Sequence, residues 1–195
     1  MVAQRRTAGL DRFIQHRMNG LDQALCAIRR LALFGRKRRR VPPRRQARTV
    51  KCFADIDVAE TCDHALVEDQ LQGRDLAGTY VNRGVLRMAV NQYDGAESDF
   101  QKSIAIDPSL GEAWVNLGAL KIARHDFAGG IADIDKGLAL GPQEPEKAYY
   151  NRALADEALD NETAAYYDYT KAAQLKPTWE PPRTELTRFT VRPAS

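Results

Sequence analysis

The sequence has few of the residues from which catalytic and metal sites are usually built. It contains three histidines and three cysteines among 195 residues. The histidines lie far apart and belong to no ligand or catalytic motif, so the sequence predicts neither a zinc site nor a general base. A glycine-rich phosphate loop and a nucleophile motif are also missing. We therefore expect a non-catalytic protein with no metal ion and no cofactor.

Long hydrophobic runs are missing as well. No stretch of about 18 consecutive apolar residues occurs, so the sequence does not predict a transmembrane helix. The most apolar part of the N-terminal region, residues 21–34, is interrupted by Arg29 and Arg30. A secretory signal instead carries its charges first and a small-residue cleavage site last. We expect a cytoplasmic protein, or an exported one if this region is wrongly assigned or removed.

Charge is divided unevenly along the chain. Residues 1–51 hold 15 Lys and Arg and two acidic residues, a net charge of +13, whereas residues 52–195 have a net charge of −10. Residues 9–34 have the apolar spacing of an amphipathic helix that could lie on an anionic membrane surface. The alternatives are a disordered, solvated leader and a wrongly assigned start. The basic run from Arg36 to Arg48 has no aromatic residue for stacking on bases, which argues against specific nucleic-acid recognition.

A five-residue phrase occurs three times and defines a repeat. It begins at Tyr80, Trp114 and Tyr149, and five further columns recur in the same register. The columns are Gly84, Gly118 and Ala153; Ala96, Gly130 and Ala165; Phe100, Ile134 and Tyr169; Ser103, Gly137 and Ala172; and Pro108, Pro142 and Pro177. Every column steps by 34 residues and then by 35, which one inserted residue in a polar connection explains.

This pattern resembles the tetratricopeptide repeat family, in which an aromatic residue, small residues in both helices and a closing proline recur. The resemblance covers residues 77–179 and departs from the family where Gly130 and Gly137 replace alanines. It implies an all-α fold, a right-handed superhelical solenoid of three helix pairs. The pairs are expected at 77–110, 111–144 and 146–179.

The expected domain organisation places caps at both ends of this array. A basic leader covers residues 1–51, and a half-repeat helix and loop cover residues 52–76. A short capping helix and a tail follow over residues 180–195. Such caps would cover the apolar faces that terminal repeats leave open.

The first helix of each pair is expected to line the concave surface of the solenoid. Periodicity places an asparagine from each repeat on that surface, together with neighbouring side chains. These residues are Asn82 with Val81, Val85 and Met88; Asn116 with Val115, Ala119 and Ile122; and Asn151 with Lys147, Tyr150 and Leu154.

A side-chain amide both donates and accepts, so a row of asparagines could pair with the backbone of a bound peptide. The row resembles the asparagine ladder in the repeats of the O-linked N-acetylglucosamine transferase. The alternative is that each amide bonds locally within its own helix. Some family members clamp a terminal carboxylate instead. Asn116 and Lys147 fit that clamp, but Val81 and Val85 stand where its first Lys and Asn should be.

The sequence therefore predicts a monomeric protein–protein interaction module that binds a peptide segment of a partner on its concave face. The alternative is a scaffold tethered through its basic leader to a membrane surface or a polyanion, with only peripheral membrane contact. Cys52 and Cys62 could form a disulfide if the chain before residue 55 folds back. Otherwise Cys62 packs as a small apolar residue and Cys52 is free.

Overall fold

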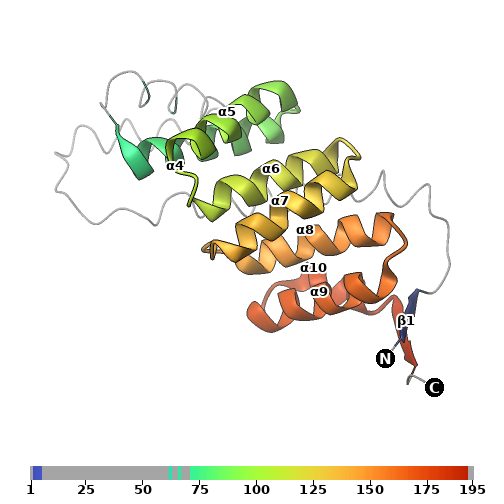
Figure 1. Ribbon diagram of the computed structural model, residues 1–195. Coiled ribbons are helices and arrows are strands. Elements are labelled where there is room, and N and C mark those ends of the chain that lie inside the picture. The colour runs from blue at the N-terminus through green and yellow to red at the C-terminus, as the bar shows by residue number, and fades with distance from the viewer. Residues whose placement is uncertain (1, 6–61, 63–65, 67–70, 193–195) are drawn as a thin grey trace. The chain divides into compact units, whose positions relative to one another are not determined.

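The computed structural model describes residues 2–5, 62, 66 and 71–192, and its elements form two compact units. Figure 1 shows the helices and strands along the chain. One unit holds α4 (Gly73–Ala89) and α5 (Tyr93–Ile106). The other holds α6 (Gly111–Ala123), α7 (Phe127–Ala139), α8 (Pro145–Ala158), α9 (Glu162–Leu175), α10 (Glu180–Leu186), β1 (Val2–Arg5) and β2 (Phe189–Arg192). The predicted all-α architecture of paired helices is confirmed.

Local sequence explains where α7 and α8 begin and where the chain turns between the two helices of each pair. Pro145 opens α8, a position where its missing N–H costs no hydrogen bond. The Asp126 side chain caps α7 by accepting a hydrogen bond from the Gly129 backbone N–H at 3.0 Å. The corner residues Asn91, His125 and Asp160 all have left-handed φ values, 60°, 65° and 59°. They follow the same 34- and 35-residue steps as the repeat columns, so the corner is part of the repeat.

Helices α6 and α7 approach each other until their backbones touch. A Cβ atom added to Gly118 would lie 2.6 Å from the carbonyl oxygen of Gly130. A Cβ atom added to Gly137 would lie 2.8 Å from the carbonyl oxygen of Gly111. The glycines that depart from the family pattern are therefore required by close packing, which outweighs their low helix propensity.

Side chains of different size close the other two pairs. In α4 and α5 the ring of the fully buried Phe100 lies against Gly84, where an added Cβ would meet it at 2.5 Å. In α8 and α9 the facing residues Ala153 and Ala165 are both fully buried. Each pair thus uses small residues on one or both helices at the columns that the repeat pattern identified.

Ion pairs join the first helix of each pair to an aspartate of the second. Asp99 is fully buried and accepts hydrogen bonds from Arg83 Nε at 2.8 Å and Nη2 at 2.6 Å. Arg87 Nη1 donates to the same carboxylate at 2.8 Å. In the other unit, Lys121 pairs with Asp133 at 2.6 Å and Arg152 with Asp168 at 2.7 Å. The three aspartates form a further repeat column, which the sequence interpretation did not identify.

The C-terminal end of this unit is closed by an aromatic cluster. The rings of Tyr169 and Phe189 lie 6.0 Å apart, and Tyr150 packs between Tyr169 and Trp179 at 5.6 and 5.1 Å. The capping helix expected after residue 180 is present as α10. Beyond it, β2 pairs antiparallel with β1, which the sequence interpretation did not predict. Most of the leader and of the expected half-repeat helix lies outside the described residues, so the predicted domain boundaries there stay predictions.

Candidate peptide-binding face

The three asparagines differ in the exposure of their side chains and in their hydrogen bonds. Asn116 is half-buried and donates from Nδ2 to the carbonyl oxygen of Glu112 at 2.8 Å, within its own helix. Asn151 is half-buried and Asn82 is exposed, and the structure shows no hydrogen bond from either amide to another described residue. Asn116 and Asn151 belong to one unit and Asn82 to the other. The local bonding that we gave as an alternative therefore applies to Asn116.

Most of the apolar residues expected beside the asparagines are buried. Between 4% and 9% of the surface is exposed at Val81, Val85, Met88, Val115, Ala119, Ile122 and Tyr150. Val115 and Ile122 pack in a cluster with Ile134, while Leu154 is half-buried against the cluster that contains Tyr150. These side chains contribute to folding, and they leave little apolar surface for a ligand. The amides, together with Lys147, are the more accessible part of the predicted set.

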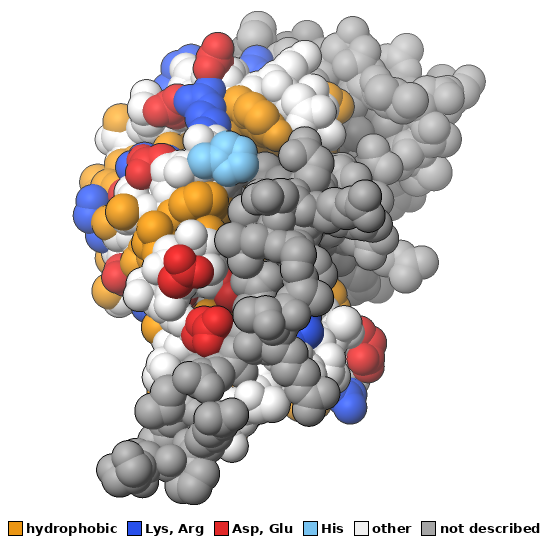
Figure 2. Space-filling model, turned by 90° about the vertical axis from the view of Figure 1, so that its right-hand side faces the viewer, with side chains coloured by type: hydrophobic (Ala, Val, Ile, Leu, Met, Phe, Trp, Pro, Cys, Tyr) orange, Lys and Arg blue, Asp and Glu red, His pale blue; other side chains and the backbone are white. Residues whose placement is uncertain are grey.

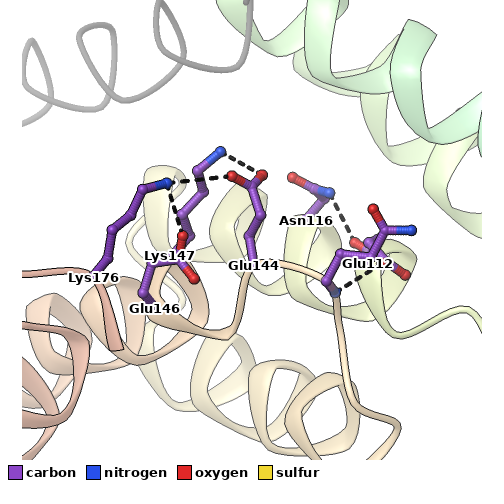
Figure 3. A network of polar contacts seen from close by, with 7 residues as sticks. Glu112, Asn116, Glu144, Glu146, Lys147 and Lys176 are labelled. Carbon is purple, nitrogen blue, oxygen red and sulfur yellow. Dashed lines mark hydrogen bonds and ion pairs between the residues drawn. The ribbon is translucent and has the colours of Figure 1, made fainter. Parts of the chain in front are cut away.

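A polar network that the sequence interpretation missed lies next to Asn116 (Figure 3). Lys147 Nζ donates to Glu144 Oε2 at 2.6 Å, and Lys176 Nζ donates to Glu146 Oε1 at 3.0 Å. Figure 3 shows the side chains of Asn116, Glu144 and Lys147 on the same side of the ribbon. Only the Glu144–Lys147 spacing of three residues gave a sequence signal for this network. Because Lys147 is already paired, its attraction for a partner's carboxylate is reduced.

The connection between α7 and α8 is bonded to α6 one turn before Asn116. The backbone N–H of Gln143 donates to Glu112 Oε1 at 3.0 Å. Glu112 thus uses its side chain for the connection and its carbonyl oxygen for the amide of Asn116. The hydrogen bond to the Glu112 carbonyl oxygen therefore orients the Asn116 side chain. The side-chain oxygen of Asn116 can accept a further hydrogen bond.

Two groups on α8 have shifted pKa values. A hydrogen bond to Asp168 raises the pKa of Arg152, so this side chain is a permanent cation. Burial raises the pKa of the Asp156 carboxyl, while a hydrogen bond from the Asn161 amide acts in the opposite direction. The charges of Asp168, Arg152 and Asp135 also act on Asp156, and no ligand-binding role follows from its shift.

The Asp156 shift predicts a pH dependence of stability. The folded state binds this proton more tightly than the unfolded chain, so the contribution of Asp156 to stability falls as the pH rises from the usual aspartate pKa through the raised one. Asp156→Asn should remove that loss and leave the protein at least as stable at neutral pH. Urea unfolding of both proteins between acid and neutral pH measures it. If the free energy of unfolding changes with pH in the variant as it does in the wild type, this account is wrong.

Other kinds of site receive no support within the described part of the chain. There, no group of three or more histidine, cysteine and acidic residues is placed to hold a metal ion. The helices of residues 71–192 are all too short or too polar to cross a membrane. On the face shown in Figure 2, hydrophobic, basic and acidic side chains alternate over the coloured surface without a large patch of one kind.

The predicted Cys52–Cys62 disulfide is not supported. Cys62 is helical and half-buried, and Cys52 lies outside the described residues. No pair of cysteines at disulfide distance is found among the residues described.

Comparison with known proteins relates one helix pair to a known repeat family. The tetratricopeptide repeat pattern matches residues 77–110, the α4–α5 pair and the connection that follows it. The α4–α5 pair matches a tetratricopeptide repeat. No curated protein matches it, but solved tetratricopeptide repeat structures do.

The first tetratricopeptide repeat domain of human RPAP3 is similar to this chain with 25% identity and a TM-score of 0.55 over 59% of this chain and 90% of that one. The first such domain of Spaghetti (RPAP3), bound to the HSP90 peptide SRMEEVD, has 24% identity and a TM-score of 0.55, over 60% and 91% of the two chains. MamA has 19% identity and a TM-score of 0.56, over 72% and 78%. These likenesses support the repeat solenoid fold.

Proposed function

We propose that this protein is a non-catalytic interaction module of the tetratricopeptide repeat kind, and that it binds an extended segment of a partner protein along the first helices α6 and α8. The observation that carries the proposal is the asparagine at the same register position of each first helix. Packing does not require these amides, because the columns beside them already fill the helix interfaces. The peptide held by the tetratricopeptide repeats of Spaghetti supports a segment of this kind.

The amides of Asn116 and Asn151 would recognise the partner's backbone rather than its side chains. Asn116 offers its side-chain oxygen, and Asn151 offers both a donor and an acceptor. Neither residue carries charge, and the nearby lysines are paired with glutamates. Binding should therefore depend little on salt. The salt dependence of binding distinguishes the proposal from the alternative, in which the basic leader tethers the protein to a polyanion or a membrane. Binding through the leader should weaken as salt is added, because salt screens the attraction between charges.

The test selects a ligand first and then removes the amides. A random peptide display library is selected on the full chain, and the affinity of a selected peptide is measured by fluorescence anisotropy. Asn116→Ala combined with Asn151→Ala should weaken binding about ten-fold or more, because each lost hydrogen bond contributes about 1 kcal/mol. Gln174→Ala, which removes an exposed amide from the second helix α9, is the matched control and should leave affinity unchanged.

Two results would contradict the proposal. One is a selected peptide that binds the double variant as tightly as the wild type while circular dichroism shows the same helicity. The other is an affinity that falls steeply with salt and is lost when the basic leader is removed, which would favour the tethered scaffold.

A further inference from the structure

The strand pair at the C-terminal end of the fold joins the two most distant described parts of the chain. Residues 2–5 run antiparallel to residues 189–192, with Val2 opposite Arg192 and Arg5 opposite Phe189. Figure 1 shows β1 beside the last strand, with the N and C labels close together. β1 also packs next to α9. Nothing in the repeat pattern or in the proposed function uses this pairing.

β2 is anchored on the repeat domain independently of β1. The ring of Phe189 is 8% exposed and lies 5.8 Å from Tyr166 and 6.0 Å from Tyr169. Just before it, Arg188 donates from Nη2 to Glu157 on α8 at 2.6 Å and from Nη1 to Glu185 on α10 at 2.6 Å. These contacts hold the start of β2 in place and present its backbone as an edge. A free strand edge is a template for pairing with another extended segment.

The pairing of β1 with this edge is short by comparison, and β1 has its further support from packing next to α9. A ribbon of two strands with four residues each is only marginally stable in water. β1 gains from being on the same chain, because a tethered segment has an effective concentration of roughly millimolar. Main-chain pairing reads backbone groups and tolerates many side chains. A firmly anchored edge with a weakly held strand has the properties of a site that can exchange its occupant.

We propose that β2 is a strand-docking site for an extended, proline-free peptide segment, and that residues 2–5 of the same chain are its resident, displaceable occupant. The site lies at the C-terminal cap, apart from the asparagines of the first helices, and does not depend on the proposed function. Its ligand is recognised through backbone hydrogen bonds, so its affinity should be sensitive to proline and tolerant of other substitutions.

Hydrogen exchange in the full-length protein tests the site. Ala3→Pro combined with Gln4→Pro removes donors and restricts the backbone of β1 without touching the repeats. In an antiparallel ribbon every second N–H of a strand donates to its partner. Exchange of the β2 amides that donate to β1 should become at least about ten-fold faster in this variant, because pairing protects them. Amides in α6 to α9 serve as the internal control and should not change.

Adding the strand back as a free peptide separates docking from a purely internal contact. A synthetic peptide of residues 1–7, at about 5 mM to exceed the effective concentration of roughly 1 mM that a tether gives, should restore protection of the β2 amides that donate to β1. The same peptide carrying both prolines is the matched control and should not. Loss of protection that the wild-type peptide fails to restore would overturn the docking site, and so would unchanged exchange in the proline variant.

A cross-link decides which chain supplies the strand. Ala3 and Val191 are opposite each other, at a spacing that a disulfide can bridge. With Cys26, Cys52 and Cys62 replaced by serine, Ala3→Cys and Val191→Cys should oxidise to a cross-linked monomer. A cross-linked dimer would show that a second copy occupies β2, and no cross-link would show that the edge is not paired. Either result would overturn the assignment of residues 2–5 as resident occupant.

Discussion

Gly118→Ala is expected to lower the free energy of unfolding by about 3 kcal/mol, because the new methyl group overpacks a backbone contact. Its Cβ would lie 2.6 Å from the carbonyl oxygen of Gly130 and 2.7 Å from Cγ1 of Ile134. The carbonyl belongs to the backbone of α7, so it can move away only if the two helices separate. Alanine's better helix propensity returns roughly 1 kcal/mol at most. Urea unfolding followed by circular dichroism measures the loss.

Gly78→Ala is the matched control for this prediction. Gly78 also lies inside a helix, α4, but an added Cβ there meets nothing within 4 Å. The same substitution should therefore stabilise the protein by up to about 1 kcal/mol through helix propensity alone. Equal effects of the two substitutions would show that the contact between α6 and α7 does not depend on glycine.

Asp99→Ala is expected to lower the free energy of unfolding by about 3–5 kcal/mol, because it removes the buried carboxylate with which Arg83 and Arg87 pair. Asp99 is fully buried and accepts three hydrogen bonds from Arg83 and Arg87. The Arg83 side chain is only 11% exposed, so water cannot replace the lost carboxylate easily. The loss should appear in the α4–α5 pair. Hydrogen exchange of the amides of α4 and α5, followed at increasing urea concentration, should show that this pair opens at less urea than in the wild type.

Two comparison variants separate burial from charge. Asp135→Ala removes an aspartate that pairs with Arg152 but is 52% exposed, and it should cost less than about 1 kcal/mol. The combined change Arg83→Met with Asp99→Leu replaces the buried pair by apolar groups and should recover most of the loss of the single variant. A double variant as unstable as Asp99→Ala alone would mean that size and shape at this position matter more than the unpaired charge.

The repeat intervals predicted the helix pairs well because every unit reuses the same packing positions. Six columns with one shared insertion locate the small residues and prolines of each pair, and the structure has helices there. Asp99, Asp133 and Asp168 follow the same steps, yet no sequence pattern indicated that they are buried. An acidic residue normally predicts an exposed position, and its burial here depends on cations of the facing helix.

The candidate site was less predictable, for two physical reasons. A first helix in a stacked array packs on more than one side, so apolar periodicity alone cannot separate a ligand-facing stripe from a core-facing one. Val115 and Ile122 illustrate this, since both pack with Ile134. The strand at residues 2–5 depends on a partner almost the whole sequence away, and four residues without a turn signal give no local indication of such pairing.

The contrast between local ion pairs and the distant strand pair has a consequence for the order of folding. Arg83 and Asp99 are separated by 16 residues, as are Arg152 and Asp168, so each hairpin can complete its polar contacts as soon as its two helices have been made. Closing so short a loop costs little entropy. The contact between Val2 and Arg192 must wait until residue 192 has left the ribosome. During synthesis, the edge of β2 is therefore completed after the helix pairs.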